Sequence, residues 1–141
     1  SWREGSAELL PLIDHLVVSE KFAHQYGGPN VKAALTDLAT HGAAVTITCG
    51  SKGSLSCAAG GSHFAMPAFP VTAVDTTGCG DVFHGGYIYG LLQGWPLPET
   101  VRFAAACAAL KTRALGGRTA IPNRTEVERF LMEHEGVRPL F

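Results

Sequence analysis

The chain has 141 residues, of which 46% are hydrophobic and 16% charged, and its formal net charge is −1. This composition excludes an intrinsically disordered chain and predicts one globular domain, which at this size buries roughly 68–70% of its unfolded surface. The near-neutral charge gives no electrostatic basis for binding nucleic acid or an anionic membrane. A local arrangement of groups therefore has to hold any anion that the protein binds.

The four cysteines are scattered along the chain and predict buried thiols in a reducing compartment, not disulfides. No apolar run approaches the ~18 residues that span a bilayer, and no basic and apolar leader is present. These features predict a soluble, cytoplasmic protein. Because the chain starts at Ser1 without a methionine, we also expect it to be a fragment or a trimmed form of a longer protein.

In chain order, the first predicted elements alternate between helix and strand. The end of a helix at 6–10 precedes a short buried strand at 16–18 and a short helix at 19–26. Asn30 is placed to cap a helix with apolar residues at helical spacing. The β-branched run 43–48 then predicts a buried parallel strand. The strand–helix–strand order indicates an α/β fold.

The second part of the chain predicts two more strands and then three helices. A glycine turn at 50–53 leads to a returning strand at 55–58, and 63–66 is one more strand. An extended segment, 71–74, leads into a helix at 79–92. Further helices are expected from Pro98 to Gly116-Gly117, and after Asn123, where Glu126 three residues later completes a capping-box pattern.

A glycine-rich turn, Asp75-Thr76-Thr77-Gly78-Cys79-Gly80-Asp81, joins the extended segment to the next helix. The first N–H groups of a helix have no internal partner, and its dipole favours negative charge there. The N–H groups of Gly78, Cys79 and Gly80 therefore predict an anion hole for a phosphoryl group. Asp81 is placed to take the proton from an alcohol that attacks a phosphate. The alternative is a simple turn whose Asp81 only complements the helix dipole.

This run, with Phe83 and Gly85 after it, resembles the signature Asp-Thr-x-Gly-Ala-Gly-Asp-x-Phe-x-Gly of the ribokinase-like (PfkB) carbohydrate kinases, with Cys79 for Ala. The resemblance implies a three-layer α/β/α fold with a mostly parallel sheet. Residues 1–141 would be its C-terminal nucleotide-binding and catalytic part, without the N-terminal sugar-binding half and lid. It also implies transfer of the γ-phosphate of ATP to a sugar hydroxyl with Mg²⁺, and Asp81 as catalytic base.

Two other segments are similar to nucleotide-binding parts of that family. The run Thr48-Cys-Gly50-Ser-Lys52-Gly53 resembles a strand-end turn near the ATP phosphates, although such turns often only join strands, and Lys52 alternatively is a solvated surface lysine. The Ala-rich stretch 101–111 and the loop 113–122 resemble the wall of the adenine pocket. The resemblance implies further cofactor-binding residues and a monovalent cation, such as K⁺, at two of them. These cofactor-binding residues are Asp75, Thr76, Thr77 and Gly116, and the cation would lie at Asp75 and Thr77.

The sequence departs from the family where an Asn-x-x-Glu motif is often found. Ser19-Glu20-Lys21-Phe22 stands there, so no protein ligand for Mg²⁺ is assigned. Several motifs look most like a branch with sulfofructose kinase and ketohexokinase-like enzymes, which suggests a ketose or a ketose derivative. Arg118 would meet an anionic sugar group or serve its loop, and His84 would approach the substrate, pack, or face solvent.

Three alternatives to a sugar kinase remain open. In these alternatives the chain is part of a nucleoside kinase, part of a vitamin kinase of the same fold, or a nucleotide-binding fragment without turnover. The expected partners are a small sugar and ATP, with a second copy in a homodimer. A fragment without its first strands also exposes a sheet edge, so we expect it to dimerise or aggregate.

Overall fold

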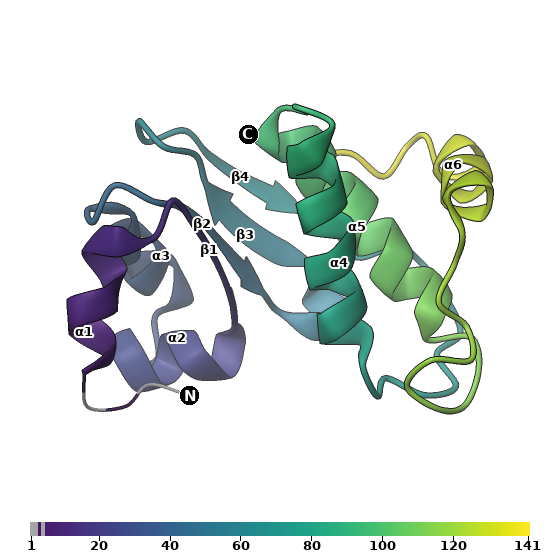
Figure 1. Cartoon of the computed structure of the whole chain (residues 1–141), viewed down its shortest axis with the longest axis horizontal. Coiled ribbons are helices and arrows are strands. Elements are labelled where there is room, and N and C mark those ends of the chain that lie inside the picture. Colours follow the sequence, from purple (N-terminus) through teal and green to yellow (C-terminus); the bar gives the residue numbers. More distant parts are fainter. Residues whose placement is uncertain (1–2, 4) are drawn as a thin grey trace. The chain divides into compact units, whose positions relative to one another are not determined.

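The computed structural model describes residue 3 and residues 5–141 (Figure 1). The chain divides into two compact units, of which the first holds Ser1–Ala65 and Leu140–Phe141 and the second Met66–Pro139. All four cysteines are free thiols. Within the described residues, no helix combines the length and the apolar character needed to cross a membrane.

The first unit is built on a four-stranded sheet in the order β1-β2-β3-β4. The strands are β1 (His15–Ser19), β2 (Ala44–Thr48), β3 (Ser54–Cys57) and β4 (His63–Met66). β1 and β2 are parallel, whereas β2 and β3 are antiparallel because the short 3-10 turn η2 (Gly50–Lys52) reverses the chain. The sheet is therefore mixed, with β1 and β2 parallel and β2 and β3 antiparallel.

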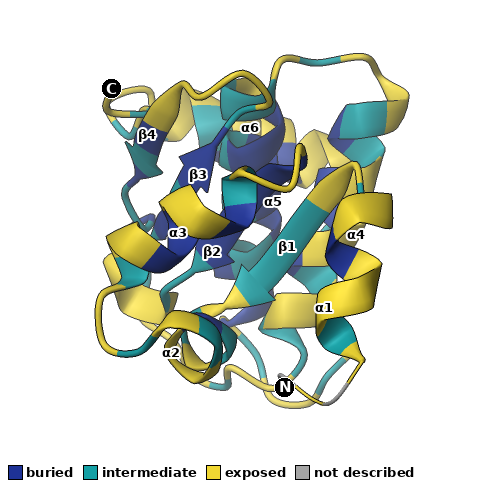
Figure 2. Ribbon diagram, turned by 90° about the vertical axis from the view of Figure 1, so that its left-hand side faces the viewer, coloured by how far each residue is buried: buried dark blue, intermediate teal, exposed yellow. Residues whose placement is uncertain are grey.

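Burial differs between the two parallel strands, as Figure 2 shows. Four of the five residues of β2 are buried, as the sequence predicted. β1 was also expected to be buried, but its central residues are only half-buried and its ends are exposed. The reason is its position, because β1 is the terminal strand of this sheet.

The helices of the first unit include one whose cap, Asn30, the sequence predicted. They are α1 (Ser6–Leu9), which continues as the 3-10 helix η1 (Leu10–Leu12), then α2 (Glu20–Gly27) and α3 (Val31–Ala39). The Ser19 hydroxyl accepts a hydrogen bond from the N–H of Phe22 at 3.2 Å, and the Asn30 side chain accepts one from the N–H of Ala33 at 3.0 Å. Side-chain oxygens of this kind satisfy donors that a helix start leaves without a partner.

The second unit contains three helices, α4 (Cys79–Leu92), α5 (Leu97–Lys111) and α6 (Arg124–Glu133). The predicted bounds of α4 are confirmed, and the capping box of α6 is present between Asn123 and Glu126. α5 ends at Lys111 and not at Gly116-Gly117. The physical reason lies at Thr112, whose carbonyl oxygen accepts hydrogen bonds from the N–H groups of Val74 and Asp75. This carbonyl therefore pairs with the segment before α4, and the helix ends.

Small residues let α4 and α5 approach closely. A Cβ atom added at Gly86 would lie 2.9 Å from the Cα atom of Ala104, and one added at Gly90 would lie 2.8 Å from Thr100 Oγ1. Real Cβ atoms essentially never make such short contacts. Gly86 and Gly90 stand four residues apart, so both face the same neighbouring helix. This packing fixes the helix that carries the glycine-rich turn at its start.

Candidate active site

The glycine-rich turn is held by the carboxylate of Asp75. One oxygen, Oδ1, accepts a hydrogen bond from the N–H of Thr77 at 2.8 Å, and the other, Oδ2, accepts one from the N–H of Gly116 at 2.8 Å. Hydrogen bonds from the Thr77 side chain and from these N–H groups lower the pKa of Asp75 to about 2. The negative charge of Asp75 thus ties the turn to the loop that follows α5.

The start of α4 has the geometry of an anion-binding helix terminus. Gly78 is the residue before the helix and has a left-handed backbone with φ +75°. A Cβ atom there would lie 3.1 Å from the carbonyl oxygen of Gly117, so a glycine is required for both space and conformation. The N–H of Cys79 donates to the Thr76 carbonyl at 3.2 Å. Those of Gly78 and Gly80 have no acceptor within the described part of the chain.

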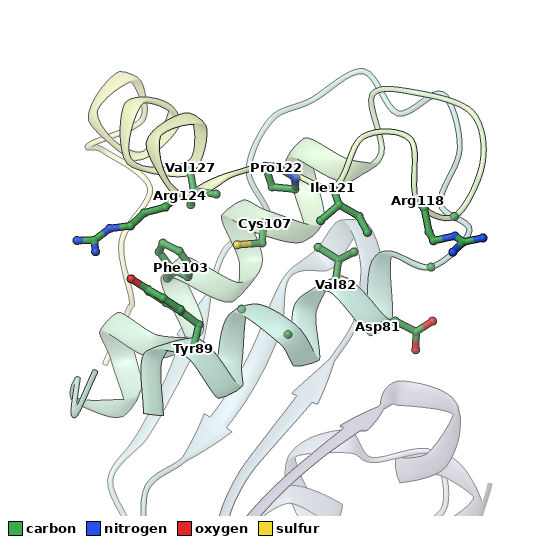
Figure 3. Close-up of a pocket in the computed structure, with 14 residues that line it drawn as sticks. Asp81, Val82, Tyr89, Phe103, Cys107, Arg118, Ile121, Pro122, Arg124 and Val127 are labelled. Carbon is green, nitrogen blue, oxygen red and sulfur yellow. The ribbon is translucent and has the colours of Figure 1, made fainter. Parts of the chain in front are cut away.

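Asp81 lies in the first turn of α4 and is exposed. It lines a cavity of about 530 Å³ within the second unit. In Figure 3, Asp81 and Arg118 lie at one end of this cavity, and Tyr89 and Arg124 lie at the other. Val82 and Ile121 also line it, which makes most of its wall apolar. A small-molecule site commonly has this size and a few polar groups on an apolar wall.

His84 is one turn along α4 from Asp81, but it does not line the cavity. Its Nδ1 donates to the carbonyl oxygen of Gly80 at 2.7 Å, and the side chain is exposed. This exposed position agrees with the solvent-facing alternative for His84.

The other predicted nucleotide-binding residues lie in the first unit, at the end of β2 and in the turn η2. The N–H of Cys49 donates to the carbonyl oxygen of Gly53 at 2.7 Å and closes the turn. Gly50 and Gly53 have positive φ of 59° and 89°, which favours glycine at both positions. The Thr48 hydroxyl donates to the carbonyl oxygen of Val18 at 3.3 Å.

Lys52 belongs to the same turn and forms an ion pair with Glu20, with 2.5 Å between its Nζ and Oε1 of Glu20. This hydrogen bond raises the pKa of Lys52 and lowers that of Glu20. Glu20 follows Ser19 in the segment where the family's Asn-x-x-Glu motif was expected. The structure thus places Lys52 at the surface with an anionic partner, a contact that the sequence did not predict.

The predicted site residues therefore form two groups. One group, in the second unit, joins the glycine-rich turn to the loop after α5 and consists of Asp75, Thr76, Thr77, Gly78, Cys79, Gly80, Asp81 and Gly116. The other group, in the first unit, consists of Thr48, Gly50, Lys52 and Gly53. Within the described residues, no three His, Cys, Asp or Glu side chains are grouped as a metal site.

Sequence reasoning assigned no role to Lys111, the last residue of α5. Its side chain is fully buried, and its Nζ donates to the carbonyl oxygen of Asp75 at 3.1 Å. The signal was a single lysine at the end of an alanine-rich, otherwise mostly apolar stretch, where a buried charge needs an explanation.

Comparisons with known proteins show the family of this chain. Residues 1–124 match the family described as pfkB family carbohydrate kinase. The 5-dehydro-2-deoxygluconokinase of Geobacillus thermodenitrificans is 34% identical over 122 residues, which are 86% of this chain and 36% of that protein.

Two solved structures are similar at the level of the fold. The ribokinase of Thermotoga maritima has a TM-score of 0.82 and 34% identity, covering 92% of this chain and 46% of that one. The Arabidopsis thaliana ribokinase, complexed with ribose and ATP, has a TM-score of 0.81 and 31% identity, covering 88% of this chain and 42% of that one. These similarities confirm the predicted ribokinase-like α/β fold, and this chain spans less than half the length of each of these relatives.

Proposed function

The chain belongs to the pfkB family of carbohydrate kinases, and on that premise we propose that the complete protein transfers the γ-phosphate of ATP to a sugar hydroxyl. Residues 1–141 are the nucleotide-binding and catalytic C-terminal part of such a kinase. We further propose that a sugar-binding half and a lid precede them, and the finding that this chain covers 36% and 46% of the two relatives supports a longer protein.

The observation that carries the proposal is the start of α4. Two N–H groups that have no acceptor among the described residues, those of Gly78 and Gly80, lie next to the exposed carboxylate of Asp81 at the end of a cavity. In the proposed reaction Asp81 accepts the proton of the attacking hydroxyl. The N–H groups stabilise the negative charge on the transferred phosphoryl group. Positioning and charge stabilisation account for most of the catalysis in this class of reaction.

We assign ATP and Mg²⁺ as cofactors. Thr48, Gly50 and Gly53 steady the phosphates, as do Thr76 and Gly116. Lys52 reaches a phosphate only after it leaves Glu20. ATP oxygens and water hold most of the coordination shell of Mg²⁺, which suits an ion that loses its water ligands reluctantly. Among the residues that the structure describes, no three His, Cys, Asp or Glu side chains are grouped as a metal site.

The substrate is a ketose or a ketose derivative. Arg118, at the same end of the cavity as Asp81, offers a cation for an anionic group of such a substrate (Figure 3). The name of the Geobacillus thermodenitrificans relative, 5-dehydro-2-deoxygluconokinase, also points to an oxidised sugar acid derivative. The complete protein acts as a homodimer. The competing functions are a nucleoside or vitamin kinase of the same fold and a nucleotide-binding fragment without turnover.

The decisive experiment measures ATP-dependent phosphorylation of ketoses, aldoses, nucleosides and sulfonated sugars by the full-length protein. Asp81→Asn is compared with Asp14→Asn, which changes an exposed carboxylate outside the site. We expect one sugar class to react and Asp81→Asn to lose about 10²–10⁴-fold in kcat, the usual contribution of a general base, while Asp14→Asn keeps the wild-type rate.

Two results would contradict the proposal. A nucleoside as the best acceptor would replace the sugar kinase by the nucleoside kinase. An Asp81→Asn variant with an unchanged rate would remove Asp81 from the chemistry and leave the anion-binding helix start without a base.

A further inference from the structure

A fully buried lysine beside the catalytic turn is the feature that the proposed reaction does not use. Lys111 is the last residue of α5, and none of its side chain is exposed. Burying an ammonium group is costly unless it is paired, so such lysines seldom occur without a specific partner. The partner here is the carbonyl oxygen of Asp75, 3.1 Å from Nζ. The position at the C-terminus of a helix also favours a positive charge.

Lys111 stands where two functional segments meet. Val74 and Asp75 donate their N–H groups to the carbonyl oxygen of Thr112, at 2.7 and 3.1 Å. The N–H of Gly116 donates to Asp75 Oδ2 at 2.8 Å. The turn that leads to Asp81 is thus joined to the loop after α5 through Asp75. The positive charge of Lys111 is one of the influences that lower the pKa of Asp75.

A monovalent cation fits this junction poorly. A cation at Asp75 and Thr77 needs oxygen atoms that are free to coordinate it. Each carboxylate oxygen of Asp75 already accepts one N–H donor, and the Asp75 carbonyl accepts the ammonium group, so a cation would have to share every one of these oxygens. A second positive charge at the same residue would also be repelled by Lys111.

We propose that the ammonium group of Lys111 takes the place of a monovalent cation at Asp75, so that this kinase works without added K⁺. Lys111 is a positioning residue. It offsets the charge of Asp75 and locks the turn 75–81 against the loop 112–117, which keeps the N–H groups of Gly78 and Gly80 in place for the phosphoryl group. The inference rests on the proposed kinase function, because the cation matters only through that site.

The test compares monovalent salts at equal ionic strength. Initial rates of the full-length wild type are measured with saturating Mg²⁺–ATP and sugar in potassium chloride and in tetramethylammonium chloride, whose cation is too large for such a site. We expect the two wild-type rates to agree within about twofold. ATP affinity and the thermal unfolding midpoint are measured in both salts and should also agree.

The variants separate charge from packing. Lys111→Met keeps much of the side-chain volume and loses the charge, and Lys32→Met is the control because Lys32 is exposed on α3. Loss of positioning in Lys111→Met should lower kcat/KM on the order of ten- to a hundredfold. Potassium or ammonium chloride should restore part of that loss, and tetramethylammonium chloride should not. A role in packing alone would show no dependence on the cation.

Strong activation of the wild type by K⁺, on the order of tenfold, would overturn the inference and leave the kinase function intact. If Lys111→Met does not fold, the wild-type comparison alone decides. If no substrate reacts in any salt, the kinase proposal fails. The ATP affinity and the thermal unfolding midpoint of the wild type in the two salts then still test whether Lys111 takes the place of a cation. A K⁺ effect on either property in the wild type then counts against the inference, and its absence supports it.

Discussion

At the scale of single residues, the carboxylate of Asp75 organises the site. Three hydrogen bonds to its charged form, two from Thr77 and one from Gly116, lower its pKa from 3.8 to about 2. A carboxylate whose pKa is lowered on folding stabilises the native state above its unfolded pKa. That stability is lost as the pH falls through the folded pKa. The contribution of Asp75 is therefore complete above about pH 4 and disappears toward pH 2.

This titration predicts the behaviour of Asp75→Asn. An amide cannot accept both N–H groups with its single oxygen, so we expect the variant to be less stable than the wild type at pH 7. The difference should shrink between pH 4 and pH 2, where the wild type loses the same charge. Urea unfolding of both proteins at pH 7, 4 and 2.5 measures this. If the free energies of unfolding of the wild type and Asp75→Asn differ by the same amount at all three pH values, the charge of Asp75 is not the source of that difference.

At the scale of elements, the contact between α4 and α5 depends on glycine. Gly86→Ala brings a Cβ atom to 2.9 Å from the Ala104 backbone, so one helix has to shift. We expect a loss of about 1–3 kcal/mol in the free energy of unfolding, typical of an overpacked site. Gly85→Ala is the matched control, since a Cβ atom there meets no atom within 4 Å. Denaturant unfolding compares the two.

Gly86→Ala and Gly85→Ala both raise helix propensity, so a difference in their stability reports the contact between α4 and α5. Equal stability of the two variants would mean that α4 and α5 relax apart at no cost. Since α4 carries Asp81 at its start, a shift of this helix in Gly86→Ala should also lower the phosphorylation rate of the full-length protein.

At the scale of the whole molecule, the 141 residues present an end strand of the sheet and exposed apolar side chains on α4. β1 is a terminal strand with a half-buried centre, a feature that invites pairing with another strand. On α4, Ile88 is 56% exposed and Leu92 is 78% exposed, although the helix is apolar on average. A helix that is apolar on all sides is usually buried. Both observations support the proposal that a preceding half of the protein packs here.

We therefore expect the isolated 141 residues to dimerise or aggregate, and to become a well-behaved species when the preceding half is supplied in the same chain. Sedimentation velocity over a range of concentrations distinguishes these states. A stable monomer of the isolated chain at all concentrations would show that its edge strand and the exposed side chains of α4 do not need a cover.

The sequence by itself determined the local features of this protein. The helix starts at Asn30 and Asn123 followed from side chains that reach an N–H group three residues away, and the turn at Gly78 from a backbone that only glycine adopts without strain. The bounds of α4 and the family followed from the same short run of residues. Such features depend on neighbours along the chain, so they can be predicted without the fold.

Only the tertiary structure decided contacts between distant segments. Lys111 lies 36 residues from Asp75, and Lys52 lies 32 residues from Glu20, so no local pattern predicts either contact. The half-burial of β1 follows from its place at the end of the sheet, and the early end of α5 follows from the bonds that Thr112 makes to Val74 and Asp75. Burial and long-range pairing depend on how the chain folds back on itself, which residue order alone does not specify.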